Sequence, residues 1–106
     1  MRQPAHPTVD QMTLSSVLFA LSDPIRLGIV RTLSDKQEHL RDDFDAHVAQ
    51  STLSHHMKTL REAGLVYSRP EGTRCFISLR PEIEERFPRL LDTVLNVSDE
   101  SRLNVV

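Results

Sequence analysis

Short polar side chains that form hydrogen bonds are concentrated in one segment of this sequence, residues 50–58. They are Gln50, Ser51, Thr52, Ser54, His55, His56 and Lys58. Hydroxyl, amide and imidazole groups of this size approach base edges and phosphates closely, and the positive end of a helix dipole favours phosphate. If the segment begins a helix, its chemistry is that of a surface that reads a nucleic acid.

The same residues are a poor basis for catalysis. His55 and His56 are adjacent, so on a helix they point in different directions and do not form an acid–base pair. The chain has no glycine-rich phosphate loop, no spacing typical of a nucleophile and its base, and no metal-catalytic motif. We therefore expect a binding protein and not an enzyme.

Charge is distributed unevenly along the chain, whose net charge is −2. Residues 51–80 contain only two acids and five cations: Lys58, Arg61, Arg69, Arg74 and Arg80. Residues 82–100 contain six acids and two arginines. Phosphate attraction depends on the local field, so a basic half with an acidic tail is compatible with DNA binding, although an ordinary solvated surface has the same composition.

Two helices are predicted in the first third of the chain. Apolar residues spaced i, i+3, i+4 and i+7 mark the first: Leu14, Val17, Leu18 and Leu21. Asp23 followed by Pro24 predicts the start of the second, because Asp is a good N-cap and Pro fits the first helical position. This second helix should stop near Ser34 and present four residues to the core: Ile25, Ile29, Val30 and Leu33.

The stretch from residue 36 to residue 48 is the least readable. Leu40, Phe44 and Val48 are four residues apart, which predicts one side of a short helix. Its acidic residues Asp42, Asp43 and Asp45 would then face water.

The polar segment belongs to a helix predicted over residues 50–63, with a buried stripe formed by Leu53, Met57 and Leu60. Ser51 or a neighbour should cap it, and Gly64 is a natural C-terminal stop. Two β-prone runs around a turn at residues 70–73 predict a hairpin over residues 65–79.

A last helix is predicted over residues 82–96, opened by Pro81. Its apolar residues are Ile83, Phe87, Leu90, Leu91, Val94 and Leu95. Pro88 lies inside this pattern, so we expect a kink or a restart near Phe87. The first and last helices carry wide apolar stripes that a domain of this size does not bury alone, which favours a homodimer.

At 106 residues the chain is long enough for one domain, which we place at residues 8–96. Residues 1–7 are predicted to form a loose arm and residues 97–106 a frayed tail. No apolar run approaches the length of a membrane span, and no signal-peptide pattern is present. The single Cys75 excludes an internal disulfide, so a reducing cytoplasm is the simplest location.

Three segments resemble the ArsR (arsenical-resistance repressor) family of winged helix-turn-helix regulators. Residues 20–27, ALSDPIRL, resemble the family's ALSDPTRL segment. Residues 50–66, QSTLSHHMKTLREAGLV, resemble its recognition helix and the start of its wing, and residues 69–79 resemble the wing, with EGTR at the tip. The resemblance covers residues 14–80 and implies a mainly α fold with a β-hairpin wing, homodimeric through its first and last helices.

This resemblance implies a regulator that binds a double-stranded DNA operator and is released by an effector, mostly as a repressor. The implied DNA contacts are Gln50, Ser51, Thr52, Ser54, His55, His56, Lys58, Arg69, Thr73 and Arg74. His56 has a second interpretation as a packed structural histidine, because it lies beside the buried stripe. The predicted dimer interface consists of Leu14, Val17, Leu18, Leu21, Phe87, Leu90, Leu91 and Val94.

A palindromic operator read by two recognition helices is expected for such a homodimer. The alternative is a winged-helix module that mediates protein interaction without specific DNA binding. The hydroxyl-rich helix and the wing arginines disfavour it, because they suit phosphates better than an apolar partner. The sequence names neither the operator, the regulated genes nor the effector, and it leaves activator and repressor open.

The metal sites familiar from this family are missing. The region of its Cys-x-Cys motif here reads EHLRDDF, residues 38–44, and the last helix carries Asp92 but no His. Two weak candidate pairs remain: His39 with Asp43, and Asp45 with His47. We favour a solvated acidic surface over either pair, and therefore expect no cofactor.

Cys75 raises a redox hypothesis, because the neighbouring Arg74 could favour a reactive thiolate. The apolar neighbours of Cys75 on the predicted strand make an inert, structural cysteine the favoured interpretation.

Overall fold

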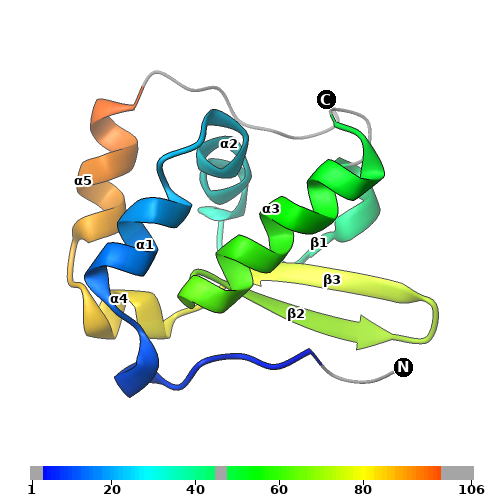
Figure 1. Cartoon of the computed structure of the whole chain (residues 1–106), viewed down its shortest axis with the longest axis horizontal. Coiled ribbons are helices and arrows are strands. Elements are labelled where there is room, and N and C mark those ends of the chain that lie inside the picture. Colours follow the sequence, from blue (N-terminus) through cyan, green and yellow to red (C-terminus); the bar gives the residue numbers. More distant parts are fainter. Residues whose placement is uncertain (1–3, 45–47, 99–106) are drawn as a thin grey trace.

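A computed structural model describes residues 4–44 and 48–98 of the chain (Figure 1). Five helices and three strands are assigned within these ranges: α1 Leu14–Ala20, α2 Pro24–Leu33, β1 His39–Leu40, α3 Gln50–Ala63, β2 Val66–Glu71, β3 Arg74–Leu79, α4 Glu82–Arg86 and α5 Leu90–Val97. Short 3-10 turns at Val9–Gln11 and Arg41–Phe44 complete the order. The mainly α architecture with a β-hairpin confirms the predicted winged helix-turn-helix fold.

The start of α2 follows the sequence closely. Asp23 is its N-cap, and the carboxylate accepts hydrogen bonds from the backbone N–H groups of Ile25 at 2.8 Å and Arg26 at 3.1 Å. Pro24 occupies the first turn, where its missing N–H has no intrahelical partner to lose. The helix ends at Leu33 with Ser34 as its C-cap, as predicted.

Strand β3 of the hairpin is the central strand of an antiparallel sheet with strand order β1-β3-β2. Glu71 pairs with Arg74, so only Gly72 and Thr73 lie between the strands. Gly72 has a φ of 61°, a left-handed conformation that glycine adopts without steric cost. The predicted hairpin is confirmed.

The short helix expected around Leu40, Phe44 and Val48 is wrong. His39 and Leu40 instead form β1, which pairs with Ile77 and Phe76 of β3, and Arg41–Phe44 is a 3-10 turn. Phe44 is nevertheless fully buried, because the turn directs its ring into the core. Strand pairing with β3, which is distant in the sequence, therefore prevails over the local helical spacing.

The core lies between α3, α2 and the sheet, and it is almost entirely aliphatic. Its fully buried residues include Ile29, Val30, Leu33, Leu53, Leu60, Leu65, Val66 and Ile77. The predicted stripe of α3 is confirmed, since Leu53 and Leu60 are 0 % exposed and Met57 is 4 % exposed.

The last predicted helix is two helices. The α4 segment ends at Arg86, with Phe87 as its C-cap, and α5 restarts at Leu90. Pro88 lies at this break, which confirms the expected restart and corrects the continuous span over residues 82–96. Arg89 adopts a left-handed φ of 66°, and its backbone N–H donates to Glu84 Oε2 at 2.9 Å. The Glu84 carboxylate thus fixes the junction.

Residues 4–7 are not the loose arm that composition predicted. Figure 1 shows this N-terminal segment running beside β2, the edge strand of the sheet. The carbonyl of Ala5 accepts from Arg61 Nε at 3.1 Å, and that of Pro7 accepts from Arg80 Nη1 at 2.6 Å. The His6 ring stacks on Tyr67. The donors of these two hydrogen bonds lie on α3 and directly after β3. Residues 1–3 and 99–106 lie outside the described residues.

No helix among the described residues is long and apolar enough to cross a membrane.

Gly64 closes α3, and the substitution Gly64→Ala tests how tightly this end is packed. Gly64 has a φ of 92°, and an added Cβ would lie 2.7 Å from Cγ of the buried Met12. Gly72 has a comparable φ of 61° but nothing within 4 Å of the same position. We expect Gly72→Ala to lower the free energy of unfolding by about 1 kcal/mol from backbone strain, and Gly64→Ala by at least ~2 kcal/mol through added overpacking. Urea denaturation at one protein concentration measures both free energies of unfolding. Equal losses in the two variants would show that the Met12 side chain moves to make room for the added Cβ.

Candidate nucleic-acid interface

The polar residues predicted to contact DNA lie on one exposed face of α3. Those exposed in its first half are Gln50, Ser51, Thr52, Ser54, His55 and Lys58. The opposite face packs into the core through Leu53, Met57 and Leu60. The structure therefore presents six hydrogen-bonding side chains along a rigid helix whose position is set by burial. Whether they contact DNA stays a prediction.

Helix α3 begins at Gln50, one residue before Ser51, which was the predicted cap. Ala49 is the N-cap and provides no side-chain hydrogen bond, so neither Ser51 nor a neighbour caps the helix. The first N–H groups of a helix have no intrahelical acceptor, and the helix dipole adds positive potential there. With no side chain of Ala49 to satisfy them, these groups suit an anionic partner such as a phosphate.

His56 is the DNA-contact candidate that the structure corrects. It is 7 % exposed, and its Nδ1 lies 3.0 Å from Arg26 Nη1. Since a guanidinium only donates, Nδ1 is the acceptor and the ring is neutral, with Nε2 directed at Asp23 Oδ2 at 3.9 Å. Burial lowers the pKa of His56, and Arg26 and His55 lower it further while Asp23 opposes them. His56 is thus a structural histidine of α3.

Arg26 connects three helices, and sequence reasoning missed this role. Its Nε donates to the carbonyl of Ala20 at 2.7 Å and its Nη2 to that of Phe19 at 3.3 Å, at the end of α1. Its remaining nitrogen holds His56 on α3. The side chain is 6 % exposed, so these bonds satisfy a charge that burial would otherwise penalise. The signal available in the sequence was the basic residue inside the ALSDPIRL segment.

Arg41 is a second residue that the sequence did not single out. Its Nη2 donates to Ser54 Oγ at 2.7 Å, which brings a guanidinium next to the exposed face of α3. Arg41 is half-buried at the start of the 3-10 turn. This contact places a cation beside a predicted groove residue and limits the rotamers of the Ser54 hydroxyl.

The two arginines of the hairpin have different environments. Arg69 donates to both Glu38 oxygens at 2.6 and 2.9 Å and to Glu71 at 2.6 Å. Both guanidinium groups lie over the Phe76 ring, at 4.7 Å from its centroid for Arg69 and 5.2 Å for Arg74. The hydrogen bond from Arg69 lowers the pKa of Glu38, so the carboxylate stays charged. Two acids therefore neutralise Arg69, whereas Arg74 and Thr73 are exposed at the tip.

The weak metal candidates are not brought together. His39 lies on β1, and its Nε2 contacts Asp35 Oδ2 at 2.9 Å. The helical i, i+4 spacing assumed for His39 and Asp43 is wrong, because β1 and a 3-10 turn replace the helix. His47 and Asp45 lie outside the described residues. Within the described ranges, no group of three or more His, Cys, Asp or Glu side chains could hold a metal ion.

Cys75 is half-buried and packs against the core. Burial raises the pKa of its thiol, the opposite of the shift that a reactive thiolate requires. Arg41 and Arg61, rather than the adjacent Arg74, are the cations that partly offset this rise in the thiol pKa, and Asp42 adds to it.

Helices α1 and α5 lie at the opposite end of Figure 1 from the hairpin tip and the start of α3, and they carry an apolar face. Leu14 and Leu18 are 48 and 45 % exposed, and three residues beside them are half-buried: Phe87, Leu90 and Val94. The other residues predicted for the dimer interface are Val17, Leu21 and Leu91. They are buried within the chain's own core, so the structure removes them from that surface.

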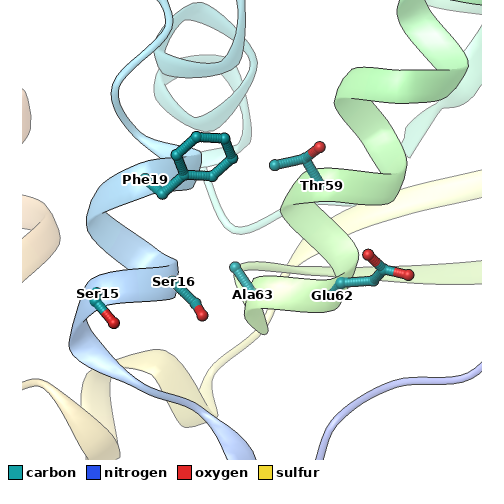
Figure 2. Close-up of a pocket in the computed structure, with 6 residues that line it drawn as sticks. All are labelled: Ser15, Ser16, Phe19, Thr59, Glu62 and Ala63. Atoms are coloured by element: carbon teal, nitrogen blue, oxygen red, sulfur yellow. The ribbon is translucent and has the colours of Figure 1, made fainter.

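A groove of about 320 Å³ separates α1 from the second half of α3. Figure 2 shows Phe19 and Ser16 of α1 opposite Thr59 and Ala63 of α3. Phe19 is 64 % exposed, and Arg26 lies under its ring at 5.4 Å from the centroid. The groove lies away from the polar first half of α3, so it separates the candidate interface from the apolar face.

Comparison with known proteins gives consistent matches. A model of a helix-turn-helix domain family matches residues 21–69. The chain is 37 % identical to an arsenical resistance operon repressor of Staphylococcus xylosus over 82 % of its length and 84 % of the relative's. It is 35 % identical to an uncharacterised HTH-type transcriptional regulator of Bacillus subtilis (strain 168), over 80 % and 89 % of the two chains.

Solved structures show the same architecture. The transcriptional repressor BigR from Xylella fastidiosa is 27 % identical, with a TM-score of 0.64 over 79 % of this chain and 84 % of that one. A homodimeric winged helix-turn-helix DNA-binding domain from Mycobacterium bovis is 28 % identical, with a TM-score of 0.63 over 83 % and 81 %.

The contact between His6 and β2 should depend on pH. The backbone N–H of Ser68 donates to His6 Nε2 at 3.0 Å, which requires an unprotonated nitrogen. Burial lowers the pKa of His6, and Arg80 and Arg61 lower it further. The contact is therefore complete above the ordinary histidine pKa of about 6.5 and is lost as pH falls through the lowered folded value. We expect hydrogen-exchange protection of the Ser68 amide to decrease from pH 7.5 to 5.

The matched control is His6→Gln, whose side-chain oxygen accepts a hydrogen bond but does not titrate. Its Ser68 protection factor should stay constant over the same pH range. A decrease of equal size in both proteins would exclude His6 as the titrating group.

Proposed function

Because this chain belongs to the ArsR family of winged helix-turn-helix transcriptional regulators, we propose that it represses transcription by binding a palindromic operator as a homodimer. It is a DNA-binding regulator and not an enzyme. The proposal concerns how it reads DNA and which residues take part. We place this activity in the cytoplasm.

The observation that carries the proposal is the division of α3 into two faces. Leu53, Met57 and Leu60 fix one face in the core, and the first two turns expose hydroxyl, amide and imidazole groups on the other. A helix held in this way enters the major groove as a rigid unit, so little ordering entropy is lost on binding. The proposed base and phosphate contacts are Gln50, Ser51, Thr52, Ser54, His55 and Lys58. His56 is excluded because Arg26 holds it inside.

Dimerisation is proposed through the apolar face that Leu14, Leu18, Phe87, Leu90 and Val94 form. The Mycobacterium bovis relative is a homodimer. Exposed leucines on a small domain favour burial against a second copy, since each removes apolar area from water. A twofold axis through this face leaves both α3 N-termini and both hairpin tips on the outside. They would then read half-sites about one helical turn apart, roughly 10 bp.

The trigger for DNA release is proposed not to be a metal held by thiolates. The chain's single cysteine is Cys75, which is half-buried on β3 and whose thiol pKa is raised by burial. A soft metal ion prefers several thiolate ligands in one site. We therefore propose that an effector of this regulator belongs to another chemical class.

The double substitution Ser54→Ala with His55→Ala tests the proposed function. Both side chains are exposed, so the fold and the thermal melting curve should not change. We expect the preference for the operator over unrelated DNA to fall by at least tenfold, because each lost base contact costs about 1–3 kcal/mol. Gel shift against the protein's own promoter region, in a salt series, measures this ratio. Ser15→Ala, an exposed hydroxyl on α1, is the control, and an unchanged ratio in the double variant would contradict the assignment of α3.

The hairpin offers a second test in the matched pair Arg74→Ala and Arg69→Ala. Arg74 is exposed at the tip, so its loss should weaken binding to all sequences and reduce the salt slope by about 1. Arg69 is already neutralised by Glu38 and Glu71, so its loss should change the slope much less. A larger effect for Arg69→Ala would mean that DNA phosphates displace the two acids.

A further inference from the structure

A cavity of about 600 Å³ lies between the end of α2, the end of β3, and helices α4 and α5. This volume falls in the range of sites for small organic molecules. Its inner wall is apolar and is formed by Leu79, Ile83, Leu91 and Leu95. Ile83 and Leu91 are 3 and 7 % exposed and belong to the core, and the half-buried Leu79 and Leu95 pack against it. We call this space the α5 cavity.

Helix α5 is fixed at both ends beside this space. At its start, Glu84 accepts from the backbone N–H of Arg89. At its end, Arg31 of α2 donates to the carbonyl of Leu95 at 3.0 Å. The cavity is thus held open by a short helix with two polar anchors.

The rim of the α5 cavity is acidic. Glu84, Glu85 and Asp92 line it together with one cation, Lys36. Within the part of the chain that the structure describes, no hydrogen bond or ion pair engages the side chain of Glu85, Asp92 or Lys36. Two uncompensated carboxylates above an apolar wall favour a molecule that has an apolar body and a positive charge at one end.

The cavity also touches the strand that leads to the hairpin tip and the helix that carries the proposed dimer face. Leu79 is the last residue of β3, whose other end forms the hairpin tip. Leu91 and Leu95 face the cavity, while Leu90 and Thr93 of the same helix line a shallow surface with Leu14 of α1. A molecule inserted beside Leu91 would therefore press on the helix that carries the proposed dimer face. Such a shift changes the spacing between two recognition helices, which operator affinity depends on.

We propose that the α5 cavity binds a small amphiphilic organic cation, such as a lipophilic amine or quaternary ammonium compound, and that it is the effector site of this regulator. The effector part rests on the proposed function, whereas the binding part does not. The apolar body would contact Leu79, Leu91 and Leu95, and the cationic end would lie between Glu85 and Asp92.

The test compares three probes with the same eight-carbon chain: octyltrimethylammonium, octanol and octanoate. Calorimetric titration of the full chain, below the micelle concentration of each probe, should show one cation bound per protomer and markedly weaker binding of the other two. Glu85→Gln with Asp92→Asn should weaken cation binding by about fivefold, which is typical of two exposed charge contacts. Lys36→Gln should strengthen it. The control Glu62→Gln, an exposed carboxylate on α3, should leave it unchanged.

Equal binding of all three probes, no binding, or the same change with Glu62→Gln would overturn the site. Cation binding to a chain shortened to end at Ser98, without binding to the full chain, would also overturn the site. In that case residues 99–106 would be the natural occupant of the α5 cavity. Gel shift with and without octyltrimethylammonium tests the effector role, and operator affinity should change at least fivefold in the wild type only. Probe binding without a change in operator affinity overturns the effector role. If the protein does not shift the operator even when no probe is present, the proposed function is contradicted instead.

Discussion

The buried guanidinium of Arg26 is the constraint on which the position of α3 depends. It donates to two carbonyls at the end of α1 and to His56 on the inner face of α3, so one charged group fixes the angle between these helices. Apolar packing alone is non-directional and tolerates small rotations of a helix, whereas these hydrogen bonds do not. Because Arg26 only donates, Nδ1 of His56 must be the acceptor and the ring must be neutral. The same bond fixes the rotation of α3 about its axis, and so the direction in which its exposed polar residues point. The orientation of the candidate interface therefore depends on hydrogen bonds on the buried side of α3.

An acidic chain serves as a DNA-binding protein here because its charges are arranged by distance from the interface. Lys58, Arg74 and Arg41 lie at or beside the proposed contact surface, while the acids of α4 and α5 lie at the other end of the molecule. Glu38 and Glu71 also lie near this surface, where they neutralise Arg69 on the hairpin, and Asp42 and Asp43 directly follow Arg41. The pairing of Arg69 with Glu38 links the hairpin to the residue before β1, and it reduces the positive charge that the hairpin presents to phosphate.

Elements whose signals are local were predictable from the sequence, and those that depend on distant partners were not. Asp23 and Pro24 place the start of α2 because a cap acts within three residues, and Pro88 marks the break before α5 because it acts on its own turn. The segment around Leu40 was misread as a helix, since its strand exists only by pairing with β3. The polar face of α3 was visible in residue types, but the burial of His56 depends on Arg26, thirty positions away, and the neutralisation of Arg69 on Glu38, thirty-one away. Periodicity carries no information about such pairs.

The N-terminal segment that lies beside β2 has a consequence for association between chains. β2 is an outer strand of a small sheet, and on its open side the backbone N–H of Ser68 donates a hydrogen bond to the His6 ring. An uncovered strand edge is a template for another chain, and pairing of edges leads to oligomers of undefined size. The contacts of Ala5, His6 and Pro7 cover this edge, which leaves the α1 and α5 face as the surface that we propose for self-association. A shortened chain that begins after Pro7 would therefore lose solubility before it lost its helices.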